Sequence, residues 1–197
     1  ATSAGGATVL LDDATRELSG SSGGANVTLT SAAGNLVIGG GGMSVGAATL
    51  TLDQPGTLTQ NAGAFVTAGN LALRTGGAVT LTQAGNDVDT LAAARTGAIS
   101  FVDADDLRVG TVGATSGVVS GGSAIALTAT GAAGDLILDD LVNAGVATAT
   151  LLAGRNVESV QGAGVTDVVA ANATIAAGVG AGTGSIGVTG GDTLETN

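Results

Sequence analysis

The sequence predicts an all-β fold, a parallel β-helix (solenoid) of about eight coils, each of roughly 18–29 residues. Three observations predict it. A short phrase of alternating apolar and polar residues recurs from end to end, glycine-bearing turns follow several of its copies, and aromatic residues are almost absent. Short strands joined by tight corners wind into coils that stack on one another.

The recurring phrase is clearest from Gly77 to Val88, which reads GAVTLTQAGNDV. Its copies begin at Ala7, Ala25, Ala48, Gly77, Gly97, Ser123, Ala147 and Ala171. The third and fifth residues of every copy are apolar, and the residue between them is mostly threonine or serine. Alternation with a period of two residues indicates strands with one buried face, so Leu81 and Leu127, at the fifth position, are predicted to point inward.

The copies recur at the spacing of a solenoid coil. A repeat of this length is too long for a hairpin and too short for a globular domain, and it fits a unit that stacks on its neighbours. The interval from Ala48 to Gly77 is longer than any other interval between successive copies. It predicts a partial extra coil around Phe65 to Leu73.

A second short apolar run follows several copies. These runs are Leu36 and Ile38, Leu71 and Leu73, Leu107 and Val109, Leu136 and Leu138, and Ile186 and Val188. The turns between the two runs include Ala33-Gly34-Asn35, Ala84-Gly85-Asn86 and Ala133-Gly134-Asp135. Glycine adopts positive φ without steric cost, and Asn or Asp tolerates it, so these triplets are predicted corners.

The composition fits a narrow, aliphatic interior. The chain of 197 residues is 44% hydrophobic and only 1% aromatic, and it contains 36 glycines and one proline. A compact globule normally uses aromatic side chains to fill its core, whereas stacked Ala, Val, Leu and Ile can fill a β-helix. The periodic apolar residues and a mean hydropathy of +0.49 disfavour a flexible linker. No break in composition marks a boundary, so residues 1–197 are predicted to form a single domain.

The sequence lacks the residues that most chemistry requires. It contains no Cys, His, Trp, Tyr or Lys, which removes disulfides, Cys and His metal sites, Ser-His and Cys-His nucleophiles and Schiff-base lysines. Its five arginines are scattered, and we predict no catalytic or cofactor-binding residues and no enzyme activity. A net charge of −11 disfavours nucleic-acid binding. The uncharged stretch from Leu18 to Leu52 is broken by Gly, Ser, Thr and Asn, so no membrane insertion is expected.

Two acidic turns are the places where a metal would bind. Asp103, Asp105 and Asp106 follow Phe101, and a second group consists of Asp135, Asp139 and Asp140. Hard cations prefer such oxygen ligands, so the first three residues are the candidates for calcium. The alternative is a solvated acidic corner without a metal, which we take as the expectation.

A threonine column suggests a second kind of ligand. Thr28, Thr51, Thr80, Thr150 and Thr174 occupy the fourth position of their copies. Ice recognition requires two regular outward columns of threonine. Two residues further on, the copies carry Asp, Val, Leu and Ala besides Thr, so the second column is not regular. Thr also suits any exposed strand position.

The segments GNLALRTGGAVTLTQAGNDVDTLAA (Gly69 to Ala93) and TGAISFVDADDLRVGTV (Thr96 to Val112) resemble the repeat region of filamentous-haemagglutinin-type exoproteins. These large secreted adhesins of Gram-negative bacteria are similar in architecture to autotransporter passengers and to other two-partner-secretion proteins. The resemblance implies a right-handed parallel β-helix in an extracellular fibre or stalk at a bacterial cell surface. It implies no catalytic residues.

The expected function is therefore that of a structural module, a rigid stalk or filament subunit of an extracellular fibre, adhesin or cell-surface sheath. The alternative is a ligand-binding solenoid, for ice or calcium. The predicted end strands carry apolar residues and no polar cap, as at Ile186. Because uncovered strand edges attract further strands, we expect a continuing chain of the same solenoid or an end-to-end homopolymer as the partner.

Overall fold

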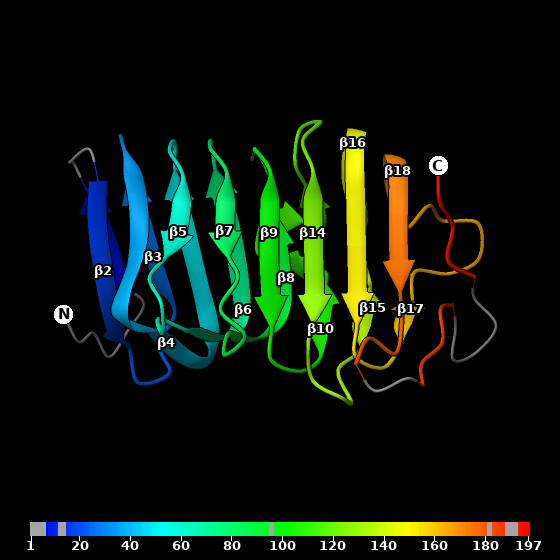
Figure 1. Cartoon of the computed structure of the whole chain (residues 1–197). Helices are drawn as coiled ribbons and strands as arrows, with labels where there is room; N and C mark the ends of the chain where they lie inside the picture. Colours follow the sequence, from blue (N-terminus) through cyan, green and yellow to red (C-terminus); the bar gives the residue numbers. More distant parts are fainter. Residues whose placement is uncertain (1–6, 12–14, 95–96, 181–182, 188–192) are drawn as a thin grey trace.

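The computed structural model describes residues 7–11, 15–94, 97–180, 183–187 and 193–197. These residues form strands, turns and bends and no helix. Apart from one antiparallel hairpin, their strands pair in parallel into one large sheet that coils into a β-solenoid of about seven turns. Figure 1 shows the turns stacked along a rod, with the N-terminus and the C-terminus at opposite ends. The predicted all-β parallel solenoid is thus confirmed.

One wall of the solenoid, which we call face 1, is an uninterrupted column of parallel strands. It stacks β2 (Thr15–Ser21), the start of β4 (Asn35–Gln54), β5 (Leu58–Gln60), β7 (Val79–Leu81), β9 (Ile99–Asp103), β14 (Ile125–Ala129), the end of β16 (Val142–Ala153) and the end of β18 (Val168–Ala176). Figure 1 shows β5, β7, β9, β14, β16 and β18 side by side along the rod.

The rest of each turn forms face 2. It contains β1 (Ala7–Leu11), β3 (Val27–Ser31), the end of β4, β6 (Val66–Thr75), β8 (Asp87–Ala93), β10 (Leu107–Val109), β13 (Val118–Val119), β15 (Leu136–Leu138), the start of β16, β17 (Val157–Ser159) and the start of β18. The column changes register at β8, where Leu91 pairs with Val109 and Ala93 pairs with Val118. Between those two partners a short antiparallel hairpin, β11 (Thr111–Val112) and β12 (Thr115–Ser116), leaves the coil.

The register differs from the alignment of the eight copies. Leu50 stacks on Leu71 of face 2 and not on Val79, which stacks on Leu58 of face 1. The first three copies therefore belong to face 2 and the last five to face 1, and the long interval before Gly77 marks the change of face. No partial extra coil exists around Phe65 to Leu73, because these residues belong to an ordinary turn. Both faces alternate with the same period, so the pattern alone does not distinguish them.

The pairing of the first copy also differs from the alignment. Val9 pairs with Leu29, two residues beyond the Val27 with which it was aligned. Of the predicted second apolar runs, Val188 lies outside the described residues.

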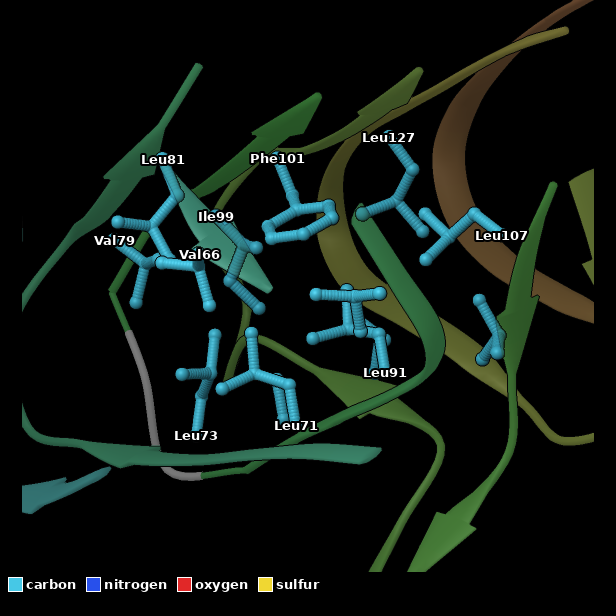
Figure 2. Packing of buried hydrophobic residues seen from close by; sticks show 14 of the residues in the cluster. Val66, Leu71, Leu73, Val79, Leu81, Leu91, Ile99, Phe101, Leu107 and Leu127 are labelled. Carbon is cyan, nitrogen blue, oxygen red and sulfur yellow. The ribbon is translucent and has the colours of Figure 1, made fainter. Parts of the chain in front are cut away.

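The core consists of self-stacked aliphatic side chains. Leu36, Leu58, Val79, Ile99, Ile125 and Ala149 form one inward ladder of face 1, and all are buried. Phe101 is the one aromatic side chain among the buried hydrophobic residues of the described chain. Figure 2 shows Val79, Leu81 and Ile99 of face 1 pointing toward the interior, opposite Leu71 and Leu73 of face 2. The small width of the interior explains the shortage of aromatic residues.

Some corners admit only glycine because consecutive turns approach very closely there. A Cβ atom at Gly154 would lie 1.9 Å from the backbone oxygen of Gly131 in the preceding turn. At Gly40, by contrast, a Cβ atom would meet nothing within 4 Å, and φ is not in the left-handed region.

The register can be tested with a pair of neighbouring substitutions. Leu81 is fully buried and Thr80 is exposed. Leu81→Asp should lower the free energy of unfolding by several kcal/mol (order of magnitude), because it buries an unpaired carboxylate. Thr80→Asp should change it by about 0.5 kcal/mol or less. Equal shifts of the urea midpoint for the two variants would contradict the inward placement of Leu81.

The corner packing can be tested with a second pair. Gly154→Ala should destabilise the solenoid by roughly 1–3 kcal/mol, because the added methyl group forces two turns apart. Gly40→Ala should be neutral or slightly stabilising, since it removes freedom from the unfolded chain without a clash. The measurement is the urea midpoint of each variant. A Gly154→Ala midpoint equal to that of the wild type would show that the corner can accommodate a methyl group.

Candidate functional site

The first acidic turn does not gather its three carboxylates. Asp103 continues the alternation of β9 and occupies an inward position, where its side chain is fully buried. Asp105 and Asp106 lie in the turn that follows and are exposed. In the described part of the chain, no three carboxylates come together in a way that could hold a metal ion. The geometry therefore gives the calcium candidates no support as a joint site.

Asp103 has a structural environment. Its Oδ2 accepts a hydrogen bond from the backbone N–H of Val88 (3.0 Å), and its Oδ1 accepts one from the N–H of Asp105 (3.2 Å). Burial removes the carboxylate from water and raises the pKa of Asp103 to about 7, although the two N–H groups act against this rise. Asp103 is thus a buried acid that changes charge near neutral pH.

Asp103 belongs to a polar layer at the corner that follows β9. Asn86, one turn earlier, is fully buried, and its Nδ2 donates to the carbonyl oxygens of Leu81 (3.2 Å) and Val102 (3.0 Å). Gln60 lies one turn earlier still, and its Nε2 donates to Asn86 Oδ1 (2.9 Å). Each amide satisfies polar groups that would otherwise be buried without partners, so the layer holds consecutive turns together.

The second acidic group is also divided among separate partners. Asp135 pairs with Arg155, whose Nε lies 2.7 Å from Asp135 Oδ1, and the guanidinium lowers the pKa of Asp135. Asp139 is exposed and pairs with Arg108 at 3.2 Å.

Asp140, the third member of this group, binds the hairpin. Its Oδ2 accepts hydrogen bonds from the hydroxyls of Ser116 and Thr111 (2.8 Å for Thr111). Burial acts to raise the pKa of Asp140, but these hydroxyls and backbone N–H groups outweigh burial and hold it below its ordinary value.

Asn and Asp at the corners bond one turn to the next. Each residue lies at the start of a strand or directly before it, and its side-chain oxygen accepts the backbone N–H of the equivalent residue one turn later. The pairs are Asn35 with Thr57 (2.8 Å), Asp106 with Asp135 (2.8 Å), Asp135 with Asn156 (2.9 Å) and Asn156 with Ser185 (3.0 Å). The sequence predicts Asn and Asp at these corners because both residues tolerate positive φ. The structure shows a bond between turns instead.

The hairpin β11–β12 is the feature that sequence reasoning missed. Val112 packs against Ala72 and Ala92, so it covers the outer surface of β6 and β8. Arg74 fixes the hairpin, because its Nε donates to Thr115 Oγ1 (2.9 Å). The signal for this excursion was the distance along the chain from Gly97 to Ser123, which is longer than the preceding interval between copies.

A surface cleft of about 450 Å³ adjoins Arg74. Its lining includes Ser31, Asp53, Gln54 and Pro55, and Arg74 Nη1 lies 4.0 Å from Asp53 Oδ2. A guanidinium beside a carboxylate offers hydrogen-bond donors and acceptors at one place. The sequence contains no histidine or lysine that could activate the Ser31 hydroxyl. The cleft thus has the chemistry to hold a polar ligand.

The predicted threonine column is divided between the two faces. Thr28 pairs with Thr51 in face 2, and Thr51 then pairs with Ala72. Thr80 lies in face 1, in an outward ladder that runs through Thr59, Thr80, Ser100, Ala126, Thr150 and Thr174. The neighbouring outward ladder contains Val102, Thr128, Leu152 and Ala176. Face 1 therefore carries one ladder rich in hydroxyls and one mixed ladder.

The buried acid gives a prediction about pH. Since the folded-state pKa of Asp103 is raised from 3.8 to about 7, the protonated form is favoured in the folded state. The contribution of this residue to stability is then fully present below pH 4 and is lost as the pH rises toward 7. The loss amounts to about 4 kcal/mol at most, at about 1.4 kcal/mol for each pH unit.

Asp103→Asn removes that titration. The free energy of unfolding of this variant relative to the wild type should rise between pH 4 and 7 and level off above 7. In this variant the side-chain NH2 group replaces one of the two accepting oxygens and faces a backbone N–H. The variant is therefore less stable by a further, constant amount of about 1 kcal/mol, which does not change the slope. Urea unfolding at several pH values measures the slope. Asp87→Asn, at an exposed position, serves as the control, and identical pH profiles for the three proteins would refute the assignment.

The comparisons with known proteins agree with the repeat architecture. A family model described as repeats of unknown function (DUF5649) matches residues 24–94, which include β3 to β8. No curated protein and no solved structure matches the chain. The described residues hold no helix that could cross a membrane. The chain is a repeat protein with a β-solenoid fold, similar over this span to a family whose function is unknown.

Proposed function

We propose that the chain is a structural module, a rigid β-solenoid stalk or filament subunit of an extracellular fibre, adhesin or cell-surface sheath of a bacterium. It acts without catalysis and without a cofactor. The resemblance of Gly69–Ala93 and Thr96–Val112 to filamentous-haemagglutinin-type exoproteins supports this proposal, as does the match to a repeat family over residues 24–94.

The observation that carries the proposal is that polar side chains at the corners bond one turn to the next. Asn35, Asp106, Asp135 and Asn156 bond one turn to the next, and Gln60 and Asn86 do the same inside the corner. These bonds lie along the rod axis and resist separation of the turns. Side chains that serve a reaction would instead converge on one point of the surface.

The end of the rod supports association with further strands. In the described residues the face 1 part of β18 pairs with β16 on one side and with no strand on the other. Ala173 occupies an inward position, in register with the buried Ala149, yet it is exposed. An open parallel edge above an apolar interior is a template for another strand. We propose that a second copy or a further turn of the same solenoid stacks there.

Association through this edge can be tested with two lysine variants. The wild-type chain should form elongated particles at tens of micromolar, roughly the range in which exposed edges associate. Ala173→Lys should abolish them, since an inward charge on an open edge blocks pairing. Thr174→Lys adds the same charge, but at an outward position in register with Thr150, and should leave association intact.

Light scattering and negative-stain microscopy measure the particles. A wild-type monomer at these concentrations, or equal effects of the two lysines, would contradict stacking through face 1 of β18.

Face 1 favours ice as the second candidate function. From β5 to β18 its outward residues are uncharged, and its first ladder carries hydroxyls at Thr59, Thr80, Ser100, Thr150 and Thr174. Thermal hysteresis of the purified chain tests this candidate directly. Thermal hysteresis that is present in the wild type and abolished by Thr80→Asp would establish ice binding. No thermal hysteresis at millimolar protein would rule out this candidate function.

A further inference from the structure

The last described turn closes with a segment that we call the C-terminal clasp, residues 193–197. The clasp lies along the start of β18, where Val168 and Thr196 form a parallel bridge. The N–H groups of Asp167 and Val168 donate to the Glu195 carbonyl oxygen (3.0 and 3.1 Å). The N–H of Asn197 donates to the Val168 carbonyl oxygen (2.9 Å), and Leu194 packs against the core.

A carboxyl group without a cation holds the centre of this contact. Asp167 is fully buried, and its Oδ1 accepts hydrogen bonds from Ser159 Oγ (2.6 Å) and Gln161 Nε2 (2.8 Å). Its Oδ2 accepts the backbone N–H of Glu195 (2.8 Å). These neutral donors leave the charge of the carboxylate without a counter-ion among the described residues.

A second carboxyl group lies against the first. Glu195 Oε1 accepts hydrogen bonds from the N–H of Gly164 (3.3 Å) and from Thr193 Oγ1 (2.9 Å). Its Oε2 is buried and has no hydrogen-bond donor in the described part of the chain. The charge of Glu195 opposes the ionisation of Asp167. A proton on Asp167 would supply a donor beside Glu195, whose Oε2 lacks one.

We propose that the buried Asp167 takes up a proton in the closed clasp, which locks the clasp onto β18 as the pH falls and loosens it as the pH rises. Closing takes up one proton from solvent, and opening releases it. Buried acceptors without donors are rare in native structures, and the proton accounts for this one.

The groups that face Asp167 agree with this direction. β17 contributes the Ser159 hydroxyl, the turn after it contributes the Gln161 amide, and β16 donates the Val142 N–H to the Asp167 carbonyl oxygen. Among the described residues, the charged group that acts on Asp167 is Glu195. Burial raises the pKa of Asp167, and the hydrogen bonds from the Ser159 hydroxyl and the Glu195 N–H offset only part of this rise, to which the charge of Glu195 adds. The closed clasp therefore retains a proton at pH values where an open one has lost it.

Hydrogen exchange on the full chain tests the proposal. After correction for intrinsic exchange, the protection of the Val168, Ala170 and Asn197 amides should fall as the pH rises from about 4 to 8. A single linked proton limits the fall to about tenfold for each pH unit. Amides of β7 and β9, in the middle of the rod, should not follow this dependence.

Glu195→Gln is the matched variant, because it removes the charge that opposes the ionisation of Asp167 and places a permanent donor on this side chain. Its clasp should stay protected at pH 7–8 to the level that the wild type reaches at acid pH. Asp167→Asn should also show a flat profile, which keeps the test valid if the first variant folds poorly. Asp89→Asn, at an exposed position of β8, should keep the wild-type slope. Wild-type protection that does not change with pH, or a wild-type slope in Glu195→Gln, would overturn the proposal.

Discussion

Parallel pairing in register is the constraint on which the rest of this structure depends. Each turn lies about 4.8 Å from the next, so every side chain is packed against the residues at the same position one turn before and one turn after. Inward positions must therefore accept self-stacking, which Leu, Val, Ile and Ala do at Leu58, Val79, Ile99 and Ala149. Corners must accept close backbone approach, and Gly154 above Gly131 illustrates this limit.

The same constraint decides how polar groups are tolerated. Stacked amides and carboxylates can pass hydrogen bonds along the rod, as the ladder through Asp106, Asp135 and Asn156 does. Stacked like charges would repel one another. Asp106 and Asp135 are neighbours in this ladder, and Arg155 offsets their charge by binding Asp135. Inside the wall the chain uses neutral amides at Gln60 and Asn86, and it places a lone carboxyl at Asp103, where its pKa rises.

The sequence was sufficient for the features that repeat. Alternation, coil length and glycine corners predicted the parallel solenoid, because each of them recurs along the chain. The assignment of copies to faces was not predictable, since both faces alternate with period two. The position of Asp103 could have been read from the alternation in ISFVD, which places it inward after Ile99 and Phe101. The prediction that Asp103 shares a turn with Asp105 and Asp106 overlooked this alternation.

Features that occur once left little signal in the sequence. The contact between Arg74 and Thr115 spans 41 positions and depends on a hairpin that no other described turn possesses. Single contacts of this kind depend on the register of the whole stack, which becomes known only when the turns are in place.

The distinction between repeated and single features also indicates where such a chain can carry a specific function. A side chain on a face packs against its neighbours in the turn before and the turn after. Faces therefore tend toward uniform, uncharged residues such as those of β7, β14 and β16. An excursion can lengthen one turn while the turns on either side remain stacked on it. The hairpin at residues 111–116 is such a change, and it brings Arg74, Asp140 and two hydroxyls into contacts that no other described turn repeats. Recognition by this rod is therefore expected at its excursions and its ends, where the requirement for self-stacking is relaxed.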